Sequence, residues 1–253
     1  MNKTIRQLIA AVALVVPAAG AFASAAGPAL EKAPINVQDT ESLQRGAQIF
    51  VNNCLSCHSA SAMRYNRLTE IGLTEDQIKG NLMLATDKIG EQMNVAMDKK
   101  DAKVWFGAVP PDLSVIARSR GADYLYGYLR GFYRDESRPT GWNNLVFDKV
   151  GMPHILWNWQ GEQVLETVKN AEGHEEHQLK LVKAGTLTKL ENGKANTAEF
   201  DKRMADLTNF MVYMAEPMQV KRQQIGYMVL LFLSLLLLPL AYFLKKEYWK
   251  DVH

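Results

Sequence analysis

The sequence predicts a mainly α-helical domain with a small β-hairpin insertion, followed by one transmembrane helix near the C-terminus. Apolar residues recur at helical spacing in two segments, 39–53 and 196–216, which predicts amphipathic helices there. Residues 225–244 are apolar and uncharged, and this stretch is long enough to cross the hydrocarbon core of a bilayer. Asn192-Gly193 lies between short segments with strand-forming residues, a pattern that is typical of a hairpin turn.

The N-terminal segment has the features of a secretory signal peptide. Lys3 and Arg6 precede an apolar run over residues 8–16, and Ala23-Ser24-Ala25 offers small residues at a cleavage site. The apolar run is too short to span a bilayer, so we do not expect a permanent N-terminal anchor. The chain is therefore expected to divide into three parts, namely a signal peptide (1–25), an exported domain (26–220), and a membrane helix with a short tail (221–253).

The first helix of the exported domain is expected over residues 39–53. Asp39 or Thr40 can cap its N-terminus. Glycine in a helix costs about 1 kcal/mol relative to alanine, so Gly46 is best explained by the close approach of another helix, the alternative being an ordinary surface glycine. The apolar face of this helix is formed by Leu43, Gly46, Ala47 and Phe50.

Cys54-Leu55-Ser56-Cys57-His58 follows this helix and has the spacing of a c-type haem attachment motif. Each thiol can form a thioether to one vinyl group of the porphyrin, and His58 can then ligate the iron. The alternatives are a vicinal disulfide or half of a zinc site, but the chain has no second cysteine pair to complete a zinc tetrahedron. We therefore predict one haem c, covalently attached through Cys54 and Cys57.

The middle of the domain is interrupted by a proline-containing segment, residues 105–114, with the sequence WFGAVPPDLS. Its two consecutive prolines make it stiff and non-helical. Asp112 or Ser114 can then cap a short helix, for which Gly121 is the stop signal. Another helix is expected over residues 124–132.

A second axial ligand to the iron would decide whether the haem is an electron carrier or an open site. Met152 is a local candidate, because Gly151 removes bulk beside the ring and Pro153 keeps the preceding backbone extended. His154 is a rival, since a neutral imidazole also binds iron. On local features the choice stays open, because further rivals are expected in the last helix, namely Met204, Met211 and Met214.

Residues 160–196 are polar and acidic, with short strands expected at 178–182 and 186–190. Between the signal peptide and residue 221 the chain has 22 basic and 25 acidic residues, so the exported domain is slightly acidic. This charge could steer a basic soluble cytochrome towards the haem, or it could be an ordinary solvated loop. Both interpretations remain open.

The last helix of the domain is expected to begin at Asn196, with Glu199 three residues later, and to end before Pro217. Its apolar face is a natural partner for the face that contains Gly46. The membrane helix over 225–244 follows. Basic residues on its two sides barely decide its orientation, but the signal peptide places the haem domain outside and the tail in the cytoplasm.

Taken together, these segments resemble cytochrome c1, the haem subunit of the quinol–cytochrome c reductase (cytochrome bc1) complex. The similarity covers nearly all of the mature chain and is of the compact bacterial type. It rests on four segments in this order: CLSCHS followed by RYNRL, GAVPPDLSVIARSRGADY, GMP, and the AEP that precedes the single membrane helix. The first segment is common to many c-type cytochromes, whereas the next two at this distance are more specific.

The resemblance implies a class I cytochrome c core and assigns roles to several residues. Met152 would be the sixth ligand of the iron, and Arg120 would hold a haem propionate. Pro110, Pro111 and Tyr124 would line the haem pocket. Residues 160–196 form a longer segment than in mitochondrial relatives and have no assigned role.

The resemblance also implies an electron-transfer subunit of a respiratory enzyme. It would take electrons from the Rieske iron–sulfur protein and pass them to a cytochrome c, next to cytochrome b and membrane lipid in a homodimeric complex. The haem domain would lie in the periplasm of a bacterial inner membrane. The sequence has no phosphate-binding glycine loop and no nucleophile elbow, and we expect no nucleic-acid partner.

Two other functions fit parts of the sequence. A stand-alone membrane-anchored cytochrome c that feeds a terminal oxidase would share the haem motif and the anchor but not the long GAVPPDLS segment. A haem sensor or peroxidase would leave the sixth position of the iron exchangeable, and its reduced form would bind carbon monoxide readily.

Overall fold

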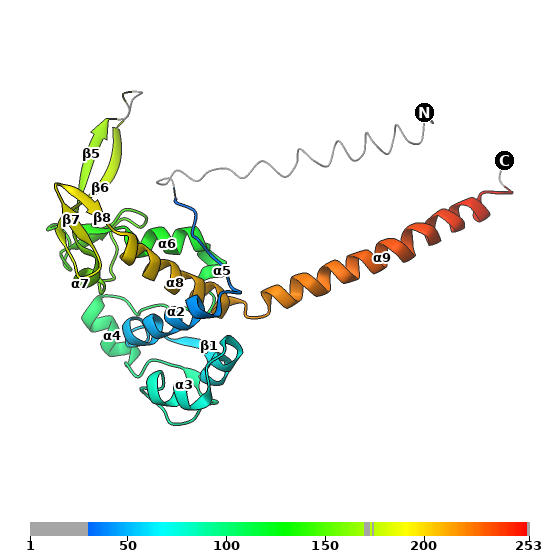
Figure 1. Cartoon of the computed structure of the whole chain (residues 1–253), viewed down its shortest axis with the longest axis horizontal. Coiled ribbons are helices and arrows are strands. Elements are labelled where there is room, and N and C mark those ends of the chain that lie inside the picture. Colours follow the sequence, from blue (N-terminus) through cyan, green and yellow to red (C-terminus); the bar gives the residue numbers. More distant parts are fainter. Residues whose placement is uncertain (1–29, 170–172, 174, 252–253) are drawn as a thin grey trace.

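Two helices from opposite ends of the domain form its centre (Figure 1). The computed structural model describes residues 30–169, 173 and 175–251, so the predicted signal peptide lies outside the described residues. Helix α2 (Thr40–Asn53) begins as predicted, since the Asp39 side chain caps it by accepting a hydrogen bond from the Ser42 amide at 3.0 Å. Helix α8 (Ala198–Ala215) packs against α2 and ends before Pro217, also as predicted.

The close helix approach predicted at Gly46 is confirmed. A Cβ atom at this position would overlap the backbone oxygen of Asp206 and the Cβ of Phe210 on α8. Next to this contact, the rings of Phe50 and Phe210 lie 5.6 Å apart. The beginning of α8 differs from the prediction. Thr197 is at the N-cap, but its hydroxyl donates to the Asp201 carboxylate at 2.6 Å and accepts no hydrogen bond from a helix amide. Asn196 accepts one from the Ala198 amide at 3.2 Å instead of forming a capping box.

Residues 60–106 combine a short strand pair with three helical segments. Strand β1 (Ala60–Arg64) pairs with the short antiparallel strand β2 (Gln92–Met93). The helical parts are the 3₁₀-helix η2 (Tyr65–Ile71), α3 (Glu75–Asn81) and α4 (Lys99–Phe106). The proline segment that follows α4 is non-helical, as predicted.

The two short helices beyond the proline segment are present with shifted ends. Helix α5 (Ile116–Arg120) stops at Gly121 as predicted, but neither Asp112 nor Ser114 caps it. Helix α6 (Ala122–Arg130) is shorter at its C-terminal end than predicted. The chain instead enters strand β3 (Phe132–Arg134), which pairs with β4 (Trp142–Asn144) and turns the chain back towards the haem motif.

The insertion contains two hairpins rather than one. After the short helix α7 (Trp157–Gln160), strand β5 (Gly161–Lys169) pairs with β6 (Glu175–Ala184), and β7 (Lys189–Glu191) pairs with β8 (Lys194–Asn196). The turn at Asn192-Gly193 is confirmed, and both residues have positive φ. The predicted strand over 186–190 is wrong in position, and β5 was not predicted because its apolar and polar residues do not alternate, with Val164 and Leu165 adjacent.

Lysines on β6 partly neutralise the acidic side chains of the insertion. Lys180 lies 2.8 Å from Glu166 across the strand pair, and Lys183 lies 3.2 Å from Glu162. These exposed pairs are the expected cross-strand contacts of a solvated hairpin. They favour the interpretation of this region as an ordinary solvated surface over the steering interpretation.

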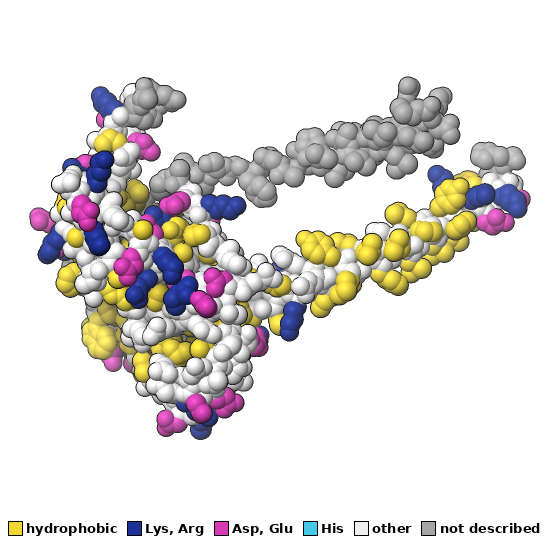
Figure 2. Space-filling model, viewed as in Figure 1, with side chains coloured by type: hydrophobic (Ala, Val, Ile, Leu, Met, Phe, Trp, Pro, Cys, Tyr) yellow, Lys and Arg dark blue, Asp and Glu magenta, His cyan; other side chains and the backbone are white. Residues whose placement is uncertain are grey.

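Helix α9 (Gln219–Tyr248) projects away from the domain (Figure 1). Within the described residues, it is the one helix whose length and apolar composition suit a membrane span. It is longer than the predicted span 225–244 and extends over about 45 Å at 1.5 Å per residue. Figure 2 shows apolar side chains along its length, with charged side chains towards its C-terminal end. Its apolar surface is exposed, as a lipid-facing helix requires.

Candidate haem-binding site

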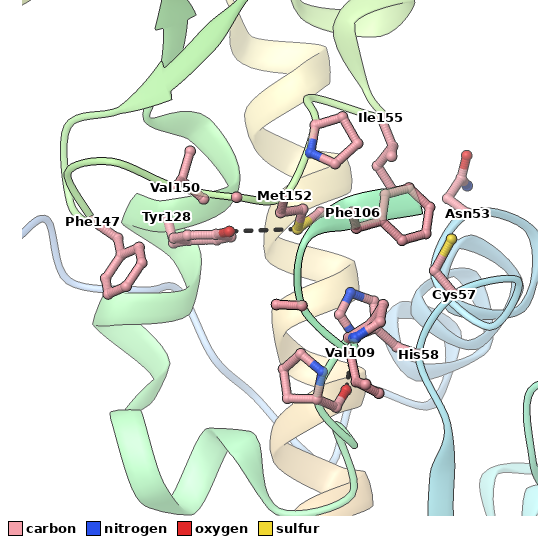
Figure 3. A pocket seen from close by; sticks show the side chains of 15 residues that line it. Asn53, Cys57, His58, Phe106, Val109, Tyr128, Phe147, Val150, Met152 and Ile155 are labelled. Carbon is pink, nitrogen blue, oxygen red and sulfur yellow. Dashed lines mark hydrogen bonds between the residues drawn. The ribbon is translucent and has the colours of Figure 1, made fainter. Parts of the chain in front are cut away.

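A largely apolar cavity of about 310 Å³ lies between the haem motif and the loop that carries Met152 (Figure 3). His58 approaches it from one side and Met152 from the other. The residues that line it are Asn53, Cys57, His58, Phe106, Ala108, Val109, Pro110, Pro111, Tyr128, Phe147, Val150, Gly151, Met152, Pro153 and Ile155.

The His58 imidazole is oriented by the proline segment. Its Nδ1 lies 2.7 Å from the carbonyl oxygen of Pro111. Because a carbonyl oxygen can only accept, Nδ1 carries the proton and Nε2 keeps its lone pair. Burial lowers the pKa of His58, although the Pro111 hydrogen bond acts in the opposite direction. The neutral ring with a free Nε2 is the form that binds iron.

Asp112 fastens the proline segment to the chain that follows the motif. Its carboxylate accepts hydrogen bonds from the amide and hydroxyl of Ser61, at 2.9 and 2.7 Å, and from the Ser114 amide at 2.8 Å. The Ser114 hydroxyl accepts from the Ala62 amide at 2.9 Å. Burial acts to raise the pKa of Asp112, but these hydrogen bonds lower it to about 2. The Pro111 carbonyl is therefore held beside His58 by a fixed set of bonds.

The two cysteines lie in a tight turn at the end of α2. The amides of Cys57 and His58 donate to the Cys54 carbonyl at 3.0 and 2.8 Å, so both thiols and the imidazole are carried by one turn. Cys57 lines the cavity, whereas Cys54 is buried beside it, and burial raises the pKa of its thiol to about 12. Both are free thiols here.

Met152 lies opposite His58, in a loop without helix or strand. The hydroxyl of Tyr128 donates to its sulfur at 3.4 Å, the contact drawn in Figure 3. Burial raises the pKa of Tyr128, so this hydroxyl keeps its proton. The rival methionines are buried in α8, away from the cavity lining, at Met204, Met211 and Met214.

His154, the other rival, is turned away from the cavity. Its ring stacks on Phe132 with centroids 4.6 Å apart and meets the edge of Trp142 at 4.9 Å. It is only 3% exposed, and burial lowers its pKa to about 4 although Gln160 acts to raise it. This neutral imidazole is part of the packing behind the Met152 loop.

Of the four remaining predicted site residues, two line the cavity and two do not. Pro110 and Pro111 line it. Tyr124 is not among the lining residues and instead stacks on Tyr128 with ring centroids 6.1 Å apart. The Arg120 guanidinium lies over the Tyr124 ring at 5.6 Å, and its side chain is exposed.

Sequence reasoning did not find several lining residues. Tyr128 is the most informative of them, and its only signal was the spacing of four from Tyr124 on a predicted helix. The other apolar lining residues come from two stretches of the chain, 106–109 and 147–155, and were not singled out individually, namely Phe106, Val109, Phe147, Val150 and Ile155.

The residues around the cavity fit a covalently bound c-type haem. Two thiols stand at one edge, an imidazole with an available Nε2 on one side, and a thioether sulfur on the other. The apolar walls suit a porphyrin. Histidine and methionine form the axial pair of a haem that carries electrons.

Comparisons with known proteins agree with this geometry. The model of the Cytochrome C1 family matches residues 31–252. Cytochrome c1 of Allochromatium vinosum is 45% identical over 98% of this chain and 100% of its own length. A Nitrosomonas europaea protein named ammonia monooxygenase gamma subunit is 53% identical over 88% of this chain and 89% of its own. Cytochrome c1 of Rhodospirillum rubrum is 30% identical over 85% of this chain and 83% of its own. The chain therefore belongs to the cytochrome c1 family.

Proposed function

We propose that this chain is the electron-carrying haem subunit of a quinol–cytochrome c reductase (cytochrome bc1) complex. Family membership supports the role of cytochrome c1. The observation that carries the proposal is the placement of His58 and Met152 on opposite sides of one apolar cavity, beside the two cysteines of the attachment motif. The bound haem would supply one-electron oxidation and reduction of its iron.

Each residue of the site has a role in this proposal. Cys54 and Cys57 fix the porphyrin by thioether bonds, so that a shallow cavity suffices to keep it. His58 offers Nε2 as the fifth ligand while Pro111 holds its other ring nitrogen. Met152 would offer its sulfur to the iron, which would raise the reduction potential and exclude small molecules from the iron.

Arg120 and Tyr124 act at the edge of the site in this proposal. Arg120 is exposed at the end of α5 and rests on Tyr124, 5.6 Å from the ring centroid. Rotation of its long side chain would let the guanidinium leave this ring and hold a propionate bidentately. Tyr124 would then back the cavity through Tyr128 rather than touch the porphyrin.

The location and partners follow from the family and from the apolar helix. We propose a class I cytochrome c core in the periplasm, with α9 as a single membrane anchor in a bacterial inner membrane and the C-terminus in the cytoplasm. Electrons would arrive from the Rieske iron–sulfur protein and leave to a cytochrome c. Cytochrome b and lipid would surround α9 in a homodimeric complex.

The test is a redox difference spectrum of the protein purified from its own membranes in mild detergent. Bands of b-type haem and an iron–sulfur signal that accompany the c-type band would support the reductase. A c-type band alone, under conditions that keep such complexes intact, would favour a stand-alone carrier. The name of the Nitrosomonas europaea relative suggests a third outcome, ammonia-dependent oxygen uptake by the purified sample without b-type haem.

A further inference from the structure

Tyr128 brings a polar group to the Met152 sulfur inside a largely apolar cavity. Its hydroxyl lies 3.4 Å from the sulfur, within hydrogen-bond distance for a sulfur acceptor. The cavity wall around this contact is apolar, with Val150 and Phe147 among its residues. The phenol therefore has one partner there, and it is the atom that would ligate the iron.

The Tyr128 ring contacts two other aromatic rings, those of Tyr124 and Phe132. Tyr124 stacks on it with an interplanar angle of 14°, and Phe132 meets it edge-on at 5.3 Å. The spacing of four residues puts Tyr124 and Tyr128 on one side of α6, and Phe132 contacts the Tyr128 ring from the start of β3. The ring cannot rotate away from the cavity without losing both contacts.

The same helix turn is tied to the loop that carries Met152. Asn144, 1% exposed, donates to the Tyr128 carbonyl at 2.8 Å. Its side-chain oxygen accepts from the amides of Val146 and Phe147, at 2.9 and 3.2 Å. One buried side chain therefore joins the Tyr128 turn to the start of the loop that leads to Met152.

We propose that Tyr128 is a positioning residue that sets the reduction potential of the haem through Met152. The hydroxyl donates to one lone pair of the thioether and leaves the other lone pair directed at the cavity. Donation withdraws electron density from the sulfur, so the sulfur stabilises oxidised iron less and the potential rises. Because the hydrogen bond restricts the position of the sulfur, it also favours one orientation of the Met152 thioether at the iron. This inference rests on Met152 being the sixth ligand.

The experiment compares Tyr128→Phe with Tyr126→Phe in the haem-loaded full chain within its complex. Tyr126 lies on the same helix but packs under the Arg130 guanidinium at 4.4 Å, outside the cavity lining. Tyr128→Phe keeps the ring and removes only the hydroxyl. We expect the equilibrium constant for reduction to fall about fivefold, which is about 40 mV at 59 mV per tenfold change. Tyr126→Phe should keep the wild-type potential.

Two readouts separate the failure of this inference from failure of the ligand assignment. The methionine–iron charge-transfer band of the oxidised protein should persist but shift in Tyr128→Phe, and it should vanish in Met152→Ala. An unchanged potential and band in Tyr128→Phe, with the band lost in Met152→Ala, would overturn the role of Tyr128 alone. A band that survives Met152→Ala would overturn the ligand assignment and this inference with it.

Discussion

The two sides of the haem cavity are built in different ways. On the His58 side, backbone groups position the ligand. The motif is one tight turn, and the Pro111 carbonyl orients the imidazole. On the Met152 side, the loop has no regular structure and depends on buried side chains, chiefly Asn144 and Tyr128. The two thiols and His58 are therefore adjacent in sequence, although Pro111 is 53 residues from His58, whereas Met152 and Tyr128 are 24 residues apart.

This difference suggests a division of roles between the two ligands. The cysteines and His58 share one turn, so they would keep the haem attached whatever the opposite loop does. The sulfur of Met152 is held by contacts that single substitutions can adjust. We expect changes on the His58 side to remove the cofactor chemistry altogether, and changes on the Met152 side to tune it.

The largest effect is expected from His58→Ala. Loss of the imidazole removes the fifth ligand and leaves the Pro111 carbonyl without its donor, so the low-spin c-type spectrum should be lost together with reductase activity. Optical spectra of the purified complex measure this. His177→Ala changes an exposed histidine of β6 and is the matched control. A normal spectrum in His58→Ala would refute the assignment of the fifth ligand.

Met152→Ala should leave the haem covalently attached but open its sixth position. Without the thioether, the equilibrium constant for reduction should fall by more than about tenfold, or 59 mV. The reduced protein should then bind carbon monoxide readily, whereas the unmodified protein should bind it poorly. Met218→Ala, a methionine 48% exposed outside the cavity lining, serves as the control. An unmodified protein that already binds carbon monoxide would support the sensor or peroxidase instead.

The contrast between the two sides also explains which features of the fold and the site could be predicted from the sequence. Three features could be predicted: the cysteine motif, the Asp39 cap and the Gly46 contact. The first two depend on residues that are close in sequence, and a glycine inside a helix is readily explained by the close approach of another helix. The role of Tyr128 was not visible, since a tyrosine on a helix face is ordinary until the fold brings Met152 to it. The strand β5 was missed because its apolar residues do not alternate with polar ones, and one of its buried side chains is the polar Gln163.

Asn144→Ala should destabilise the Met152 side of the cavity in particular. This side chain is buried and forms hydrogen bonds to Tyr128, Val146 and Phe147. Its removal leaves backbone groups without partners and should lower the free energy of unfolding by about 3 kcal/mol. Denaturant unfolding of the haem-loaded protein measures this, with the exposed Asn158→Ala as control. The methionine–iron band should weaken before the haem spectrum changes, and simultaneous loss of both would contradict the separation of the two sides.

Asp112→Asn should have the smallest effect and should act on the His58 side. The Asp112 carboxylate has a pKa of about 2, below its ordinary value of 3.8, because of hydrogen bonds from Ser61 and Ser114 that outweigh the effect of burial. Its stabilising contribution is therefore complete above about pH 4 and is lost as the pH falls towards 2. Since the side chain is exposed, solvent screening limits the loss in Asp112→Asn at neutral pH to about 1 kcal/mol.

The pH dependence distinguishes this carboxylate from a neutral structural contact. Urea unfolding at a series of pH values measures this. The free energy of unfolding of the unmodified protein should exceed that of Asp112→Asn at neutral pH, and this difference should disappear between about pH 4 and pH 2. Asp76→Asn, which changes an exposed carboxylate in the first turn of α3, is the control because Asp76 does not line the cavity. The difference in free energy of unfolding between Asp112→Asn and the unmodified protein could instead stay constant down to pH 2. Hydrogen bonding to the ionised carboxylate would then not be what holds the proline segment against His58.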